Sequence, residues 1–330
     1  MGGSPGIFAT YQTPEDTEKK LFLNYRHNQK PIMKKQVITF GLLLFCLTAF
    51  TQTTDRKLQA KLGEAVKGFN GGLGVYIKNI RTGKIVAIDA DSVFPTASIV
   101  KVPISIGIME KIRNGELQYE QELIYKDSLL YAGEDILGSF KHGEKILLNK
   151  VMMLMLAMSD NTASLWLQSL AGGGARINAI MDSLELINTR VNSRTEGRRK
   201  NWENYGWGQT SPREMGTIMQ MIYDNTLFPD SISDRLKRNL SNNFWDQNGA
   251  LSQVPPHIQV FSKGGAVDGS RNEAMIVNSL KNPYIFCVFT KNIQDTSWKR
   301  SNEAWALVRK LSAIVWKHYN PGDKWIAPYQ

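Results

Sequence analysis

The order of hydrophobic and polar positions predicts strands near both ends of the chain and helices between them. Near the start, Leu58, Leu62, Val66 and Phe69 recur at the spacing of one helix face, which predicts a helix over residues 57–69. Apolar runs typical of strands follow it closely and recur late in the sequence. The predicted strands are residues 73–79, 84–89, 258–261, 273–278 and 284–290.

The middle of the chain has the spacing of helices. A helix is expected over residues 98–113, with Pro103 in its first turns and Asn114 and Gly115 at its end. The Met- and Leu-rich residues 150–158 predict a buried core helix rather than a metal site. Further helices are expected up to about residue 186, from the Ser211 cap and Pro212 onward, and over about residues 301–318.

These patterns predict a single α+β domain over residues 52–330. Strands from both chain ends would pair in one antiparallel sheet flanked by helices, with an all-helical lobe inserted between them. We expect the α/β lobe to comprise about residues 57–95 and 213–320, and the helical lobe about residues 96–212.

The first 51 residues are expected to lie outside this domain. Residues 1–32 are polar and without periodicity, which indicates a disordered extension or a mis-assigned start codon. A short basic stretch from Met33 and an apolar run to Phe50 give residues 33–51 the character of a signal peptide. The run is short for a membrane span, and a single N-terminal anchor is the alternative. We therefore expect a periplasmic or secreted protein without stable membrane insertion once the signal is removed.

The charge balance argues against a nucleic-acid partner. The chain carries 40 Lys and Arg against 30 Asp and Glu, a net charge of +10. Residues 51–330 keep 34 basic against 27 acidic side chains, an excess of +7. There is no basic stripe with interleaved aromatic residues. A modest positive charge suits an envelope protein that works near anionic polymers.

Cysteine and histidine usage predicts neither a disulfide nor a metal site. Cys46 lies in the predicted signal, so Cys287 is the one thiol of the mature domain and no internal disulfide can form. Cys287 lies in a strand-like run and is expected to be a buried apolar residue. No cofactor is expected. The histidines, which lack the spacing of metal ligands, are His27, His142, His257 and His318.

Three short motifs follow one another along the chain. Ser98 and Lys101 are three residues apart on a predicted helix and share one face. A lysine beside other cations can lose its proton there and activate the serine hydroxyl. About one such pair is expected by chance in a chain of this length, so the interpretation depends on the combination of this pair with two later motifs. The two later motifs are Ser159-Asp160-Asn161 and Lys263-Gly264-Gly265.

The three motifs together resemble those of the penicillin-recognising serine enzymes, the β-lactamases and penicillin-binding transpeptidases. Their order and spacing are most similar to those of class A β-lactamases, over about residues 57–318. The resemblance implies a β-lactamase/transpeptidase-like fold and a covalent acyl-enzyme on Ser98.

The resemblance also implies a role for each motif residue. Ser98 is the nucleophile, Lys101 activates it, and Ser159 relays a proton to the leaving nitrogen. Asn161 hydrogen-bonds the substrate amide, and Lys263 attracts the substrate carboxylate. Asp160 is expected to order its own turn. The other substrate-binding candidates are Gly265, Ala266 and Arg271. The backbone N–H of Ala266 joins that of Ser98 as an oxyanion donor. Arg271 either binds the substrate carboxylate or is a surface hairpin residue.

Residues 188–209 turn polar, with many Arg, Asn, Trp and Gly, and are predicted to form a long functional loop. Within it, Arg194-Thr195-Glu196 resembles the Arg-x-Glu element with which class A enzymes aim a water at the acyl-enzyme. Glu196 is therefore the expected general base, and Glu203 is the alternative.

Three departures from the class A pattern weaken the case for efficient turnover. Gly197 follows the glutamate where a Leu-Asn pair is usual, with Asn201 one position late as a substitute. Gln209 stands where an Asp pairs the loop arginine. Gly264 replaces a Thr or Ser, which removes a charge-assisted hydrogen bond worth about 1.5–3 kcal/mol. In place of an Asp–Arg ion pair, the residues expected to hold the loop are the aromatic Trp202, Tyr205 and Trp207.

The sequence thus predicts a secreted, monomeric serine hydrolase of the class A β-lactamase type, acting on small β-lactams. A cell-wall DD-peptidase or esterase-like hydrolase of the same fold is the alternative that Gly264 and the altered loop favour. A non-catalytic penicillin-binding envelope protein is a third, against which the five intact motif residues argue.

Overall fold

The computed structural model describes residue 2 and residues 53–133, 136–241, 243–245 and 248–328. The chain divides into two units, residues 1–51 and 52–330, and every element named below belongs to the second. The predicted N-terminal extension and signal peptide lie outside the described residues, apart from Gly2. Within the described part of the chain, no helix combines the length and apolarity needed to cross a bilayer.

An antiparallel five-stranded sheet joins the two ends of the domain, as predicted. Its strand order is β2-β1-β10-β9-β8, so that the first strand pairs with the last. The glycine-rich residues 263–265 extend the strand predicted at residues 258–261, because their backbone pairs with the neighbouring strand. The strands are β1 (Gly72–Asn79), β2 (Ile85–Ile88), β8 (Val260–Val267), β9 (Ser270–Val277) and β10 (Tyr284–Lys291).

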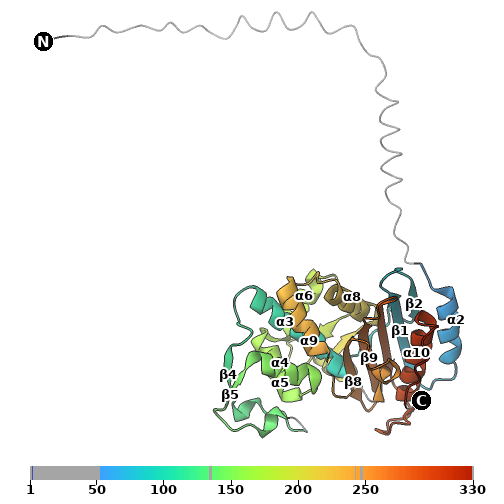
Figure 1. The fold of residues 1–330 in the computed structure, drawn as a ribbon. Helices are drawn as coiled ribbons and strands as arrows, with labels where there is room; N and C mark the ends of the chain where they lie inside the picture. Colours follow the sequence, from blue (N-terminus) through green and yellow to red (C-terminus); the bar gives the residue numbers. More distant parts are fainter. Residues whose placement is uncertain (1, 3–52, 134–135, 242, 246–247, 329–330) are drawn as a thin grey trace, which may run out of the picture. The chain divides into compact units, whose positions relative to one another are not determined.

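Helices cover both faces of this sheet. α2 (Arg56–Ala65) and α10 (Glu303–Tyr319) lie side by side on one face (Figure 1), where Leu62 and Leu311 belong to one buried cluster with Val75. α8 (Pro212–Tyr223) packs on the other face, against β1, β9 and β10. Successive strand residues point to opposite faces, so each strand serves both cores. Cys287 is buried, as expected, and burial raises the pKa of its thiol.

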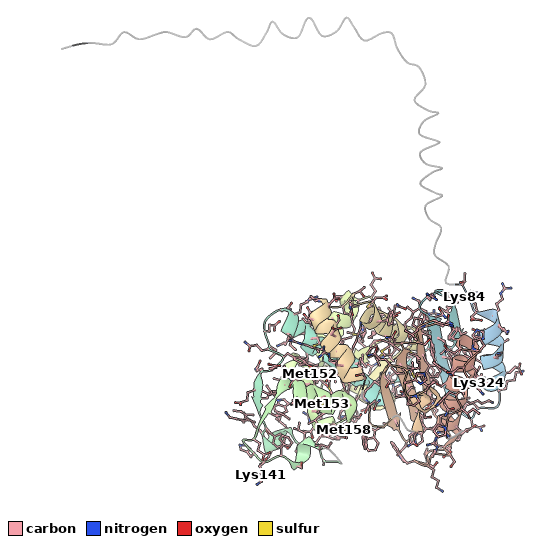
Figure 2. All side chains as sticks on the ribbon, viewed as in Figure 1. Lys84, Lys141, Met152, Met153, Met158 and Lys324 are labelled. Atoms are coloured by element: carbon pink, nitrogen blue, oxygen red, sulfur yellow. The ribbon has the colours of Figure 1, made fainter. Side chains whose placement is uncertain are left out.

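The segment that separates the early from the late strands in the sequence folds into a second lobe of helices beside the sheet (Figure 1). Met152 is fully buried and Met153 is 45% exposed, so the Met-rich helix faces the core on one side (Figure 2). The sequence missed a short hairpin, β4 (Glu122–Ile124) with β5 (Lys145–Leu147), because three-residue strands carry little pattern. The helices are α3 (Lys101–Arg113), α4 (Leu148–Ala157), α5 (Asn161–Leu170), α6 (Gly173–Ser183) and α9 (Asp230–Leu240).

The polar stretch predicted as an irregular loop contains regular structure. β6 (Arg190–Val191) and β7 (Gly208–Thr210) join β3 (Phe94–Pro95) in a three-stranded sheet of order β3-β7-β6. Between β6 and β7 the chain forms the short helix α7 (Arg199–Tyr205). β3 lies directly before Ser98 in the sequence, so its pairing with β7 fixes the entry to the first motif.

Asp55 joins the two ends of the domain. Its side chain caps α2 by accepting a hydrogen bond from Leu58 N, and its Oδ2 lies 2.8 Å from Nε2 of His318 on α10. Partial burial raises the pKa of Asp55, but the hydrogen bonds from Leu58 and His318 and the charges of His318 and Lys84 outweigh it. The pKa of the folded carboxyl therefore lies below its ordinary value.

We expect Asp55→Asn to lower the free energy of unfolding at pH 7 by about 0.5–1 kcal/mol, because the amide keeps the cap and loses the charge. A depressed folded pKa stabilises the fold above the pKa of the unfolded chain, and this contribution is lost as pH falls through the folded value. Urea unfolding at pH 7 and at a series of lower pH values should show the difference in unfolding free energy between the two proteins closing as Asp55 becomes protonated. A difference of the same size at all of these pH values would contradict the assignment.

Candidate active site

Ser98 lies at the junction of the small sheet, the helical lobe and the large sheet. It belongs to a short 3₁₀ helix, η1 (Ala97–Val100), that leads directly into α3. Ala97 has a left-handed φ of 45°, an uncommon conformation for a residue with a side chain. Such strained positions gather where the surrounding structure holds a functional group in place. The side chain of Ser98 is half-buried and faces a cleft.

Lys101 is fully buried, and its amine contacts the other motif residues. Its Nζ lies 3.1 Å from Ser98 Oγ and 3.0 Å from Ser159 Oγ. It donates to the backbone oxygen of Ser159 and to Asn161 Oδ1, the latter at 2.9 Å. A carbonyl and an amide oxygen can only accept, so they take two amine hydrogens. In the neutral amine the lone pair is directed to the side of the two hydroxyls. The amine can therefore accept the Ser98 proton on this lone pair.

The second motif occupies the tight connection between α4 and α5. Ser159 has a φ of 60°, which turns its hydroxyl and its backbone oxygen toward Lys101. Asp160 caps α5 by accepting a hydrogen bond from Ala163 N at 2.7 Å, and its other oxygen accepts one from Leu137 N at 2.8 Å. The expectation that Asp160 orders its own turn is therefore confirmed.

Lys263 brings the large sheet into the site. It is 1% exposed, and its Nζ lies 3.2 Å from Ser159 Oγ and 2.8 Å from the backbone oxygen of Gly264. Ser159 Oγ thus lies within hydrogen-bond distance of both lysine amines. A hydroxyl in this position can pass a proton from Lys101 to a departing group.

Gly265 sets the distance between β8 and the start of η1. A Cβ at this position would lie 2.5 Å from Thr96 O and 3.0 Å from Ser98 N. Only glycine therefore lets the strand run so close to the serine. We assign Gly265 this spacing role, because a side chain at this position would point at Thr96 and Ser98 and not at a substrate. The approach brings the next residue, Ala266, into the lining of the cleft beside Ser98.

Two hollows meet at Ser98, and Asn161 and Ala266 line both of them. The first hollow, about 680 Å³, extends toward the small sheet, and the second, about 560 Å³, extends along β8. Of the residues that line these hollows, the sequence had singled out Ser159, Lys263, Tyr205 and Trp207 among others, but not Tyr131, Asn204, Glu273 or the tryptophans at positions 245, 298 and 305. The first is lined among others by Tyr131, Asn204, Tyr205 and Trp207, and the second by Ser159, Lys263, Glu273, Trp245, Trp298 and Trp305.

The structure does not bring Glu196 into either hollow. Glu196 is exposed and lines a third hollow with Arg194. Tyr131 and Trp207 line both the first and the third hollow, and their rings pack edge to face at 5.1 Å between centroids. The two rings form a wall between Glu196 and Ser98. The alternative, Glu203, is also exposed and pairs with Arg199 on the surface of α7.

A different arginine from the predicted one holds this segment. Gln209 Oε1 accepts hydrogen bonds from Arg198 at 2.9 Å and from Asn201 at 3.0 Å. Arg198 also donates to Asn192 Oδ1 at 2.9 Å. Asn201 therefore braces the segment, and the glutamine takes the place of a carboxylate partner. Trp207 contributes through its backbone oxygen, which accepts hydrogen bonds from Asn192 N and Ser193 N.

Arg271 is neither a surface hairpin residue nor directed at a substrate carboxylate. It lies in β9, is fully buried, and stacks on the rings of Trp298 and Trp305 at 4.5 and 4.6 Å. Its guanidinium donates to the backbone oxygens of Val267, Ser270 and Ser297. Burial lowers its pKa, and the charges of Asp268 and Asp295 oppose this. The sequence could not predict this, because the carbonyls and rings come from distant segments.

Comparisons with known proteins agree on one family. The family model described as "Beta-lactamase enzyme family" matches residues 56–319. The beta-lactamase VEB-1 of Pseudomonas aeruginosa is 22% identical over 296 residues, covering 86% of this chain and 98% of that protein. The solved structure of PBP-A superposes with a TM-score of 0.73 at 22% identity, over 82% of this chain and 98% of that one. A variant of PBP-A was solved as an acyl-enzyme with penicillin G. A beta-lactamase structure from Chitinophaga pinensis gives 0.72 at 19% identity, over 79% and 99%.

We expect Gly265→Ala to slow covalent labelling of Ser98 by a fluorophosphonate about 100-fold, the usual effect of losing one oxyanion donor. The added methyl group must push β8 away from Thr96 O and Ser98 N. Gly63→Ala, whose Cβ would meet no atom within 4 Å, is the control for a glycine-to-alanine change. Labelling of a folded Gly265→Ala protein at the wild-type rate would contradict the spacing role.

Proposed function

The chain belongs to the beta-lactamase enzyme family, and from that premise we propose that it is an exported serine hydrolase whose Ser98 opens β-lactam rings through a covalent acyl-enzyme. The observation that carries the proposal is the buried amine of Lys101, 3.1 Å from Ser98 Oγ and 3.0 Å from Ser159 Oγ. This arrangement connects a nucleophile to a proton donor for the leaving group. The substrate is a small molecule, and the chemistry uses only side chains and backbone of this chain.

In the proposed acylation, Lys101 accepts the proton of Ser98 as Oγ attacks the lactam carbonyl. The N–H groups of Ser98 and Ala266 stabilise the oxyanion of the tetrahedral intermediate. The C–N bond then breaks, and Ser159 gives its proton to the ring nitrogen while Lys101 replaces it. The charge of Lys263 stabilises the departing side of the substrate and its carboxylate. Asn161, anchored by Lys101, holds the amide of the acyl side chain.

Hydrolysis of the acyl-enzyme is the slower half of the proposed reaction. Glu196 lines the third hollow, behind the wall formed by Tyr131 and Trp207. Asn204 and Tyr205 line the first hollow beside Ser98 and carry no carboxylate. A water that attacks the ester from the first hollow then lacks a carboxylate as the general base that gives about 10²–10⁴-fold acceleration. Acyl-enzyme should therefore accumulate during turnover.

A second candidate function keeps the fold and the nucleophile and changes the substrate. A cell-wall DD-peptidase or an esterase-like hydrolase also needs Ser98, Lys101 and Ser159, and tolerates the loss of a hydroxyl at Gly264. The position of Glu196 in a separate hollow favours this alternative, because slow release of a β-lactam acyl-enzyme does not require a different fold or nucleophile. Turnover of a D-Ala-D-Ala peptide without consumption of penicillin would establish it.

We expect intact-mass spectrometry of the purified protein mixed with penicillin G to show one adduct that is absent from Ser98→Ala. Because hydrolysis is proposed to be slower than acylation, most of the protein should carry the adduct while penicillin remains. A folded wild-type protein that neither forms an adduct with penicillin nor consumes it would refute the proposed function. Penicillin consumption without accumulation of adduct would refute only the order of the two rates.

We expect Glu196→Gln to change the rate of adduct loss less than about threefold, because the side chain lies in a separate hollow. For comparison, the removal of a true general base costs about 10²–10⁴-fold. The measurement is the decay of the adduct after excess penicillin is removed, with Glu203→Gln in parallel. A hundredfold slower decay in Glu196→Gln alone would show that the segment rearranges in the acyl-enzyme and would restore the role expected from the sequence.

A further inference from the structure

The second hollow receives the departing part of a substrate. The leaving atom must lie beside the hydroxyl that protonates it, and Ser159 lines the second hollow but not the first. Lys263 and Gly264 continue the same wall along β8. Under the proposed function, the other side chains that line this hollow contact the leaving group, whatever acyl group lies in the first hollow.

One indole ring is held directly beside the second motif. Trp245 Nε1 donates a hydrogen bond to Met158 O at 2.8 Å, and Phe244 N donates one to Ala157 O at 2.9 Å. Both acceptors lie at the end of α4, within two residues of Ser159. These bonds fix the indole, yet Trp245 is 58% exposed and lines the hollow. An apolar ring therefore lies open to the space that a leaving group enters.

A second indole ring comes from the segment that precedes α10. The Nε1 of Trp298 donates a hydrogen bond to Asp268 Oδ1 at 2.9 Å, so this ring is also fixed. The guanidinium of Arg271 covers one of its faces, with 4.5 Å between Cζ and the ring centroid. Trp305 packs against it edge to face, with 5.9 Å between centroids. Trp298 is still 59% exposed and lines the hollow.

The polar atoms of these two indoles are already used. The Nε1–H groups of Trp245 and Trp298 have acceptors within the protein, so the rest of each ring offers a ligand only apolar contact. Ile136, which is 43% exposed, and Met158 add aliphatic surface to the same lining. Covering Arg271 accounts for one face of Trp298 and leaves the exposed parts of both indoles without a structural role. Aromatic rings pack favourably against such surfaces, either stacked or edge to face.

We propose that the second hollow is a subsite for a leaving group that carries an aromatic ring, with Trp245 and Trp298 as the residues that determine this specificity. The proposal rests on the proposed function of Ser98 and adds the substrate class. While the scissile carbonyl lies at Ser98, the ring of the leaving group packs against the exposed indoles. A leaving group without a ring reacts at the same centre and lacks this contact.

A pair of thioesters of phenylacetylglycine tests this preference. One leaving group is 3-phenylpropane-1-thiol and the other is propane-1-thiol, in which the sulfur has the same surroundings and the ring is absent. In each case the Ser98 Oγ–C bond forms, the C–S bond breaks, and the serine proton passes through Lys101 and Ser159 to the thiolate. Thiol release is followed with a disulfide reagent, and Ser98→Ala gives the background. We expect kcat/KM, which does not depend on the later hydrolysis of the shared acyl-enzyme, to favour the aromatic thioester about tenfold.

Removal of the indoles should remove the preference. In Trp298→Leu the ratio of the two kcat/KM values should fall below about threefold, and in Trp245→Leu/Trp298→Leu it should approach one, because leucine has no ring to stack on. Trp298→Phe keeps an aromatic ring and loses the hydrogen bond to Asp268, and it should keep most of the wild-type ratio. Trp325→Leu, at a position that lines none of the three hollows, is the matched control and should keep the full ratio.

Two outcomes of these measurements would overturn the subsite. Equal kcat/KM values for the two thioesters in the wild type would show that the ring gains nothing in the hollow. An unchanged ratio in the double variant, with both rates lowered together, would show that the indoles have only a structural role, such as covering Arg271. Loss of the penicillin adduct, by contrast, would refute the function of Ser98.

Binding without reaction gives an independent test. Adding 3-phenylpropan-1-ol to isotope-labelled Ser98→Ala protein should shift the indole N–H resonances of Trp245 and Trp298 in a saturable way, with propan-1-ol at equal concentration as the control. Each resonance is assigned by its absence from the corresponding leucine variant, and that of Trp325 should not move. No saturable shift at either position, or an equal response to propan-1-ol, would overturn the aromatic subsite even if neither thioester is a substrate.

Discussion

The buried amine of Lys101 is the contact on which the site depends. It joins η1, which carries Ser98, to Ser159 in the connection between α4 and α5 and to Asn161 at the start of α5. Taking a lysine out of water is unfavourable unless its hydrogens are bound. These contacts offset this, and they hold only while the segments that carry them keep their positions. Through Ser159 Oγ the same network reaches Lys263 on the large sheet, so the proposed catalytic groups and the packing of the two lobes are coupled.

The sequence predicted those parts of the molecule whose pattern is local. Helix spacing, strand runs and three short motifs were sufficient for the antiparallel sheet, the inserted helices and the residues around Lys101. The resemblance of Arg194-Thr195-Glu196 to an Arg-x-Glu element was not sufficient to place Glu196 beside Ser98. The residues between Glu196 and Gln209 form α7, and the hydrogen bonds of Arg198 and Asn201 to Gln209 fix that helix with Glu196 on the outside. Side-chain partners across a loop decide such a position, and they leave no periodic signal.

Arg271 shows the same limit within one strand. The sequence made Arg271 the candidate for charge recognition because it follows the third motif at the length of a hairpin. Its direction is decided by carbonyl oxygens in the hairpin and near residue 297, and by rings at positions 298 and 305.

The strand order β2-β1-β10-β9-β8 also has a consequence for the time at which the protein becomes active. β1 cannot complete its pairing until β10 has been synthesised, more than 200 residues later. The strand that carries Lys263 reaches the serine only in the same step. Contacts between residues so distant in sequence form slowly. A nascent chain therefore holds the proposed nucleophile, Lys101 and Ser159 before Lys263 is in place, and its proposed site is complete only when the C-terminal strands have joined the sheet.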